Sequence, residues 1–171
     1  MINEKMNNMK RKNNMKADSV LREQLHSLLF DRNAHQNFAA AVNNFPQTDI
    51  DRYAENVPYS PWQLIEHIRI AQWDIVEFMI NPKHISPKFP DGYWPDRNHH
   101  GSWSDWLRSL SLIEIDFKRV KNLIGDRSLD LFSEIPHAPG YTYLREILLI
   151  ADHNAYHIGG LVNLRRLLRN W

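Results

Sequence analysis

Apolar side chains recur at helical spacing in four long segments of this chain, and its sequence lacks the alternating pattern of a convincing β-strand. The expected helices cover about residues 19–43, 60–81, 102–125 and 142–168. Helices of this length would each be about 30–40 Å long, because an α-helix rises about 1.5 Å per residue. Segments of that size suit a four-helix bundle, so the sequence predicts an all-α fold of this class.

Local signals mark where these helices begin. Asp18 can cap the first helix. Ser60 can cap the second, Pro61 suits its first position, and Gln63 completes a capping box. Ser102 opens the third helix in a similar way. These signals predict the start of the second helix most sharply.

One domain and a short tail account for the whole chain. Its 171 residues are enough for one ordinary domain, which we place at residues 18–171. Residues 1–17 are predicted to form a basic, flexible tail, because several cations stand there among asparagines and methionines. The proline-containing segment 85–101 is a long connection, and such connections are usually functional or cross the end of a bundle.

Composition excludes several classes of protein. The chain has no cysteine, which removes thiolate zinc sites, iron–sulfur clusters and a cysteine nucleophile. Its 21 basic and 20 acidic residues give a net charge of +1, which is not typical of a nucleic-acid binder. No apolar run approaches the ~20 residues of a membrane span, and no signal-peptide core stands near the start. We therefore expect a cytoplasmic protein with neither nucleic acid nor membrane as a partner.

Two histidines on the last predicted helix have the spacing of metal ligands. His153 and His157 are four residues apart, which places their Cβ atoms about 5–6 Å apart on one face of a helix. Two imidazoles so placed can both reach one ion at about 2.1 Å. The zinc-binding HEXXH helix uses the same spacing, but Asn154 stands where that motif has glutamate. The pair alone is equally compatible with ordinary hydrogen-bonded or exposed histidines.

A third histidine strengthens the metal interpretation. His67 stands at the edge of the apolar face of the second predicted helix. An unpaired polar group buried there would cost about 1–3 kcal/mol, so three core-facing imidazoles need partners. Neutral imidazole is the commonest protein metal ligand, and bundle cores are where such sites are built. The pattern leaves a metal site and a hydrogen-bonded polar cluster as alternatives. Most of the remaining histidines, His84 among them, are expected to be exposed to solvent, while His35 could approach the core.

Two segments of the sequence resemble a known family. Residues 59–75 (YSPWQLIEHIRIAQWDI) resemble the second helix of the DinB/YfiT-like proteins, and residues 144–159 (LREILLIADHNAYHIG) resemble their metal-binding last helix. The resemblance implies a four-helix bundle with a long crossover between helices two and three. It also implies that His67, His153 and His157 bind one divalent ion, zinc or nickel, and that the protein is a homodimer.

Three histidine ligands without a fourth protein ligand leave coordination positions open, as in catalytic rather than structural sites. Family members with an assigned activity include thiol-dependent transferases and isomerases. We therefore expect a metal-dependent enzyme that transfers a small-molecule thiol to an electrophilic small-molecule substrate. The thiol would arrive as a low-molecular-weight cosubstrate, because the chain has no cysteine.

Two alternatives remain open. A metal-dependent hydrolase would need a general base, and Glu146 and Asp74 lie within one to two turns of the ligands on their own helices. Either carboxylate could instead support an imidazole N–H or form a salt bridge. The other alternative is a non-catalytic, metal-binding, dimeric stress protein whose ion only stabilises the fold.

Aromatic residues of the long connection complete the prediction. Tyr93 and Trp94 are expected to cap the metal cavity and contact an apolar part of the substrate, or else to anchor the connection to the helices. A second apolar stripe on the last helix provides surface for a homodimer.

Overall fold

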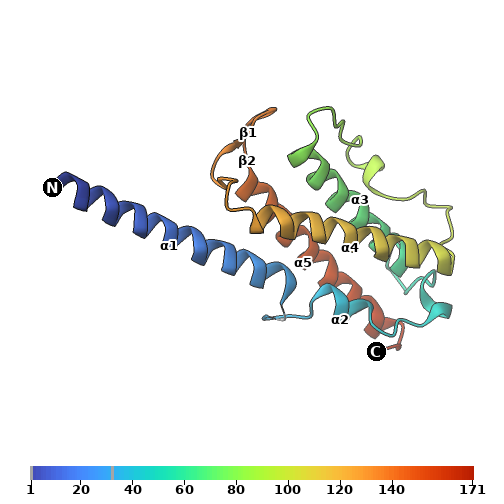
Figure 1. The fold of residues 1–171 in the computed structure, drawn as a ribbon. Helices are drawn as coiled ribbons and strands as arrows, with labels where there is room; N and C mark the ends of the chain where they lie inside the picture. Colours follow the sequence, from blue (N-terminus) through green and yellow to red (C-terminus); the bar gives the residue numbers. More distant parts are fainter. Residues whose placement is uncertain (1, 32) are drawn as a thin grey trace.

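The structure is a computed structural model that describes residues 2–31 and 33–171, apart from the side chains of residues 2–5, 8, 10 and 11 (Figure 1). Its α-helices are α1 (Ile2–Phe30), α2 (Phe38–Val42), α3 (Pro61–Ile80), α4 (Trp103–Gly125) and α5 (Tyr143–Leu167). Two 3-10 turns, η1 (Gln47–Asp49) and η2 (Asp91–Tyr93), and two strands, β1 (Glu134–Ile135) and β2 (Ala138–Thr142), complete the elements. The chain is mostly helical, as its sequence predicts.

Side-chain caps start the three helices that build the site. The Ser60 hydroxyl accepts a hydrogen bond from the Gln63 N–H at 3.2 Å, and the Gln63 side chain accepts one from the Ser60 N–H at 3.0 Å. Ser102 and Asp105 form the same reciprocal box before α4, and Thr142 caps α5. The predicted bounds of α3, α4 and α5 are confirmed to within about one residue.

The first predicted helix is wrong in its bounds. The segment 19–43 is not one helix, because α1 ends at Phe30 and a separate short helix, α2, follows. Short polar side chains end the first helix by bonding to the backbone. The Asn33 amide donates to the Ser27 carbonyl at 2.6 Å, and Asn37 caps α2. Apolar residues of α2 continue the helical spacing, but the polar segment between the two helices interrupts the series of backbone hydrogen bonds.

The start of α1 also differs from the prediction. Asp18 is not a cap but lies within the helix, where it pairs with Arg22 at 2.8 Å. Residues 2–17, which the sequence assigns to a basic tail, form the first part of α1, and Figure 1 shows this part projecting beyond the other helices. The side chains of Lys5, Lys10 and Arg11 lie outside the described residues.

A short β-hairpin precedes α5, although the sequence predicts no strand. Glu134 pairs with Thr142 and Ile135 pairs with Ala138, with an irregular register between them. Ile135 and Ala138 are buried against the helices. The first strand has only two residues, and the second contains proline and glycine and does not alternate between buried and exposed positions, which explains why the pattern misses them.

Helix α3 packs against both α4 and α5, and the core divides into two apolar clusters along it. Ile65 and Ile68 belong to the first cluster, near α2, and Val76 and Met79 belong to the second, near the hairpin. Helix α5 contributes to both clusters as well. The stretch of α3 that carries His67 therefore borders the first cluster, because Ile65 and Ile68 flank this histidine.

Buried arginines fasten the helix ends. The Arg22 guanidinium on α1 donates to the carbonyls of Ile124, Asp126 and Leu129 at 2.7, 2.9 and 2.6 Å. Arg165 on α5 makes the same kind of contact with main-chain carbonyls at the end of α2. These charges satisfy carbonyls that a helix end leaves without an intrahelical partner. They fix α1 against the end of α4 and α2 against α5.

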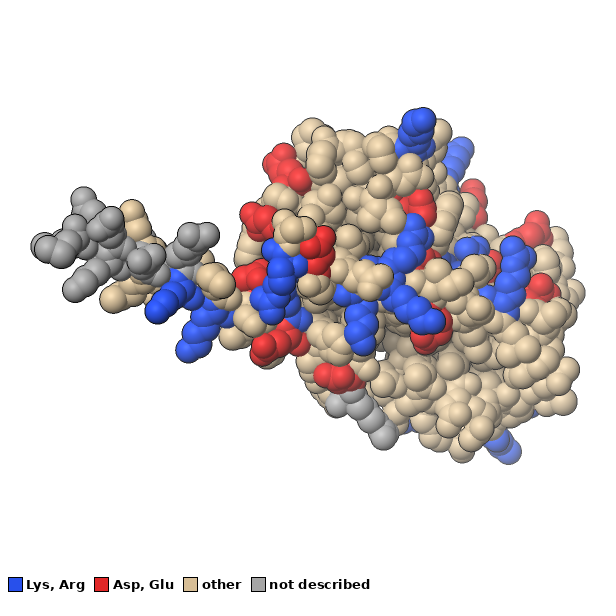
Figure 2. Space-filling model, in the orientation of Figure 1, with Lys and Arg blue, Asp and Glu red and all other residues tan. Residues whose placement is uncertain are grey.

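The surface gives two further observations. None of the described helices combines the length and apolar character needed to cross a bilayer. Figure 2 shows acidic and basic side chains interspersed over the face that it presents.

Position 101, just before α4, requires glycine because the Trp62 ring lies very close to its backbone. A Cβ atom at this position would lie 2.2 Å from Cδ2 of Trp62, whose ring is only 3% exposed. We expect Gly101→Ala to lower the free energy of unfolding by about 1–3 kcal/mol, because the buried indole must shift to make room for the methyl group. Urea unfolding measures the change.

Gly125→Ala is the matched control, because nothing lies within 4 Å of a Cβ atom built there. We expect that variant to change the free energy of unfolding by less than about 0.5 kcal/mol. Equal effects of the two substitutions would contradict the close approach.

Candidate metal centre

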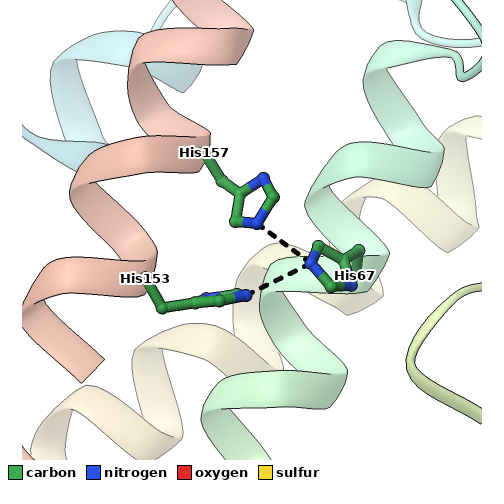
Figure 3. Close-up of side chains that lie close together, drawn as sticks. All are labelled: His67, His153 and His157. Atoms are coloured by element: carbon green, nitrogen blue, oxygen red, sulfur yellow. Dashed lines mark hydrogen bonds between the residues drawn. The ribbon is translucent and has the colours of Figure 1, made fainter. Parts of the chain in front are cut away.

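Three imidazoles from two helices converge on one point (Figure 3). His67 comes from α3, and His153 and His157 come from successive turns of α5. The Nε2 atom of His67 lies 3.0 Å from Nε2 of His157 and 3.2 Å from Nε2 of His153. The structure thus brings together the three histidines that the sequence singles out, as a group that could hold a metal ion.

The spacing of these nitrogens fits a shared ion. Nitrogens that bind one ion at about 2.1 Å with angles between about 90° and 109° lie about 3.0–3.4 Å apart. The observed separations from His67, 3.0 and 3.2 Å, fall within this range. Hydrogen bonds alone satisfy the cluster poorly, because the single Nε2 lone pair of His67 cannot accept two in-plane donors. The donor set therefore suits a divalent cation.

A main-chain carbonyl fixes the tautomer of His67. Nδ1 of this ring lies 2.7 Å from the carbonyl oxygen of Tyr93, and a carbonyl oxygen only accepts hydrogen bonds. Nδ1 must therefore carry the proton, which leaves the lone pair on Nε2. This is the usual outer contact of a histidine that binds a metal, and it orients the ring.

A relay of buried amides ends in a longer contact of the same kind with His153. The Gln72 amide nitrogen donates to a carbonyl of α4 at 2.9 Å, so the Gln72 oxygen faces Asn154. The Asn154 amide nitrogen donates to that oxygen at 2.7 Å, which leaves the Asn154 oxygen to face Nδ1 of His153 at 3.5 Å. Each hydrogen bond fixes the orientation of the next side-chain amide, because an amide nitrogen only donates and an amide oxygen only accepts. The relay links α4, α3 and α5 and leaves the lone pair of His153 on Nε2.

Burial keeps the three imidazoles neutral. Desolvation lowers the pKa of His67, although its bond to the Tyr93 carbonyl opposes the shift. Desolvation also lowers the pKa of His153. The pKa of His157 falls to about 3, through burial first and then through repulsion from the other two rings. Neutral imidazoles with free lone pairs are the form that binds a metal.

Aromatic rings cover the histidines. The Trp94 indole stacks on His67 with the ring centroids 4.0 Å apart and the planes 2° from parallel. Tyr59 stacks on Trp94 at 5.4 Å, and Tyr156 meets His157 edge-on at 4.9 Å. The structure thus places Trp94 against the cluster, where the sequence expects a cap.

A groove of about 830 Å³ begins beside this aromatic cover. Tyr59 and Trp94 line it together with Gln63, Pro90 and Arg97. Gln63 lies one helical turn before His67 on α3. The groove therefore lies next to the cluster, with the Trp94 ring between its space and the His67 ring.

The two predicted carboxylates have other partners. Asp74 accepts hydrogen bonds from the Tyr93 hydroxyl and from Nε2 of His84, both at 2.6 Å. Burial and the Asp74 carboxylate raise the pKa of Tyr93 to about 12, so this phenol stays protonated. Glu146 is buried and pairs with Arg145. Within the described part of the chain, neither carboxylate hydrogen-bonds to one of the three clustered histidines.

Sequence reasoning misses several residues around the cluster. His84 is not exposed as expected, because its side chain is 6% exposed and bound to Asp74. Gln72 and Asn154 could have been noticed as amides on core-facing positions, each beside a residue of a ligand stripe. Tyr59 carries no such signal, since its place depends on how the chain turns into α3.

The clustered histidines should make the stability of the metal-free protein depend on pH. Their pKa values lie below the ordinary value of 6.5, so the unfolded chain binds protons that the folded chain excludes. The stability that neutral rings contribute is therefore complete above pH 6.5 and declines as the pH falls toward about 3 for His157. Urea unfolding of chelator-treated protein between these values should show the decline.

The His157→Gln variant isolates this contribution, because glutamine does not titrate. We expect its unfolding free energy to depend less steeply on pH below 6.5 than that of the wild type. Parallel pH profiles for the two proteins would show that the cluster does not resist protonation.

Comparison with known proteins leaves these geometric observations to stand alone. The chain matches no family model, no curated protein and no solved structure in the comparisons made.

Proposed function

We propose that this protein is a metal-dependent enzyme of the DinB/YfiT-like family, in which His67, His153 and His157 bind one zinc or nickel ion. We propose further that it transfers a small-molecule thiol to an electrophile. The observation that carries the proposal is the convergence of three Nε2 atoms from α3 and α5 within reach of one ion. The outer contacts of His67 and His153 support it, because they direct two of the lone pairs toward that point.

The arrangement of helices supports the family assignment. Helices α1, α3, α4 and α5 are long, and the two ligand-bearing helices pack directly against each other. A long connection, residues 81–102, joins α3 to α4 and contacts α3 through η2 (Figure 1). We therefore infer a four-helix bundle with a crossover between its second and third helices, counted as α3 and α4.

The proposed chemistry divides between the ion and the chain. A divalent ion lowers the pKa of a coordinated thiol, which makes its sulfur a nucleophile at neutral pH. The thiol would lose its proton to solvent, its sulfur lone pair would form the bond to the electrophilic carbon, and the leaving group would depart as an anion with the electrons of the broken bond. The chain supplies the three neutral ligands and, in Trp94 and Tyr59, an aromatic wall for the electrophile. Since the chain has no cysteine, the sulfur must arrive with the cosubstrate.

Hydrolysis is the weaker candidate, because the carboxylates expected to act as its base are engaged elsewhere. Both oxygens of Asp74 accept strong hydrogen bonds, from Tyr93 and His84. Glu146 pairs with Arg145 and lies about two turns before His153 on α5. A nucleophile that needs no protein base, such as a coordinated thiol, suits this site better.

The activity can be tested with zinc- or nickel-loaded protein, 2-mercaptoethanol and the chromogenic electrophile 1-chloro-2,4-dinitrobenzene, which releases chloride. We expect Trp94→Ala to raise KM for the electrophile by about 10-fold, because the stacked indole is lost. The melting temperature of the variant should fall by only a few degrees, since Trp94 is only partly buried.

Trp103→Ala serves as the control, because Trp103 is also partly buried but stacks on Trp106 and not on a clustered histidine. We expect its KM to equal that of the wild type. A large loss of stability in Trp94→Ala with unchanged kinetics would show that the indole only holds the connection to the helices and does not bind the electrophile. No metal-dependent turnover, together with unfolding on chelation, would favour a structural ion instead.

We also propose that two copies of the chain associate through the outer face of α5. Leu148, Tyr156 and Leu167 lie on one side of this helix and are 43%, 77% and 59% exposed. Sedimentation velocity at micromolar concentration should give a dimer, and a Leu148→Lys, Leu167→Lys double variant should give a monomer, because charge would replace the apolar contact. A wild-type protein that sediments only as a monomer would remove this proposal.

A further inference from the structure

The connection between α3 and α4 makes three polar contacts that form a continuous chain. The Asp74 carboxylate on α3 accepts a hydrogen bond from the Tyr93 hydroxyl at 2.6 Å. The carbonyl of the same tyrosine accepts a hydrogen bond from Nδ1 of His67 at 2.7 Å. His84 donates to the other oxygen of Asp74 at 2.6 Å. Tyr93 thus joins one buried acid of α3 to the histidine two turns earlier on the same helix.

These polar contacts help to fix this part of the connection in place. Two of its large apolar side chains before Tyr93 do not anchor it, because Ile85 is 88% exposed and Phe89 is 81% exposed. Asp74, in contrast, is 7% exposed, so its hydrogen bonds to Tyr93 and His84 are shielded from water. Charge-assisted hydrogen bonds in such surroundings are about twice as strong as neutral ones.

We propose that Asp74 is a positioning residue for the metal centre, which acts through Tyr93 on His67. The Asp74 carboxylate holds the Tyr93 ring, and this sets where the Tyr93 carbonyl meets Nδ1 of His67. The carbonyl fixes the His67 tautomer and ring plane, and it places Trp94, the next residue, flat on that ring. Loss of the phenol–carboxylate contact therefore loosens both the hydrogen bond and the aromatic cover. The inference rests on the proposed metal site.

The test compares zinc and nickel dissociation constants, measured by competition with a chromophoric chelator, for the wild type and two variants. Tyr93→Phe removes only the hydroxyl, and Asp74→Ala removes its acceptor. We expect both to weaken metal binding by about 10-fold or more, the usual effect of losing an outer contact of a metal ligand. We also expect the visible spectrum of the cobalt-loaded variants to shift, because the His67 ring is no longer held in one orientation. Asp74→Asn keeps an oxygen that can accept from the phenol, and it should restore affinity to within a few-fold of the wild type.

Tyr53→Phe is the matched control. Its hydroxyl also donates to a side chain of α3, the Gln63 oxygen at 2.8 Å, but it does not act on a clustered histidine. We expect Tyr53→Phe to bind metal as the wild type does. Tyr53→Phe and Tyr93→Phe should lower the melting temperature of the metal-free protein to a similar small extent, because each loses one hydrogen bond of a hydroxyl group.

The outcomes separate the inference from the proposed function. Wild-type protein that binds neither zinc nor nickel would overturn both. Wild-type protein that binds metal, with Tyr93→Phe and Asp74→Ala within twofold of its affinity, would overturn only the role of Asp74. The same would follow if Tyr53→Phe lost as much affinity as Tyr93→Phe. If Asp74→Ala does not fold, Tyr93→Phe alone decides, because it is the smaller change.

Discussion

The meeting of α3 and α5 at three imidazoles is the constraint on which the rest of this structure depends. His67 is buried beside the first apolar cluster, and His153 and His157 are partly buried on the facing helix, so bulk water does not fully hydrate these rings. Buried polar groups are stable only when each donor and acceptor has a partner. The two rings of α5 and the one of α3 leave their Nε2 atoms facing one another, and a cation is a partner that the three lone pairs could share. The packing of α3 against α5 and the candidate chemistry therefore both depend on these three imidazoles.

The groups behind the ligands come from different parts of the fold and use different chemistry. His67 is held by a main-chain carbonyl from the α3–α4 connection. His153 is held by Asn154, which Gln72 and α4 orient in turn. The Tyr93 carbonyl fixes the tautomer and ring plane of His67, and the Asn154 oxygen lies 3.5 Å from Nδ1 of His153, so the Nε2 atoms of these two rings already face one another without an ion. The long connection thus has a structural task, which accounts for its path along α3.

The sequence predicts those features that depend on local spacing and not those that depend on the path of the chain. The Ser60 box and the spacing of His153 and His157 follow from helical geometry, and both are confirmed. The break after Phe30 is missed because apolar spacing continues across it while the backbone does not. The contact between Tyr93 and His67 is also missed, because any residue has a carbonyl and only the course of the loop decides which one arrives. The position of Asp74 on α3 predicts a general base or a partner of an imidazole. Its observed partners, Tyr93 and His84, come from that same loop, whose course the sequence does not predict.

Metal content, measured by mass spectrometry on protein purified without a histidine tag, tests the central claim most directly. The account predicts one zinc or nickel ion per chain, absent from His67→Ala and from His153→Ala. His100→Ala should keep the ion, because that exposed ring bonds to Asp51 away from the cluster. Wild-type protein that contains no metal, and takes up none when zinc or nickel is added, would contradict the account and reduce the three imidazoles to a hydrogen-bonded group in the core.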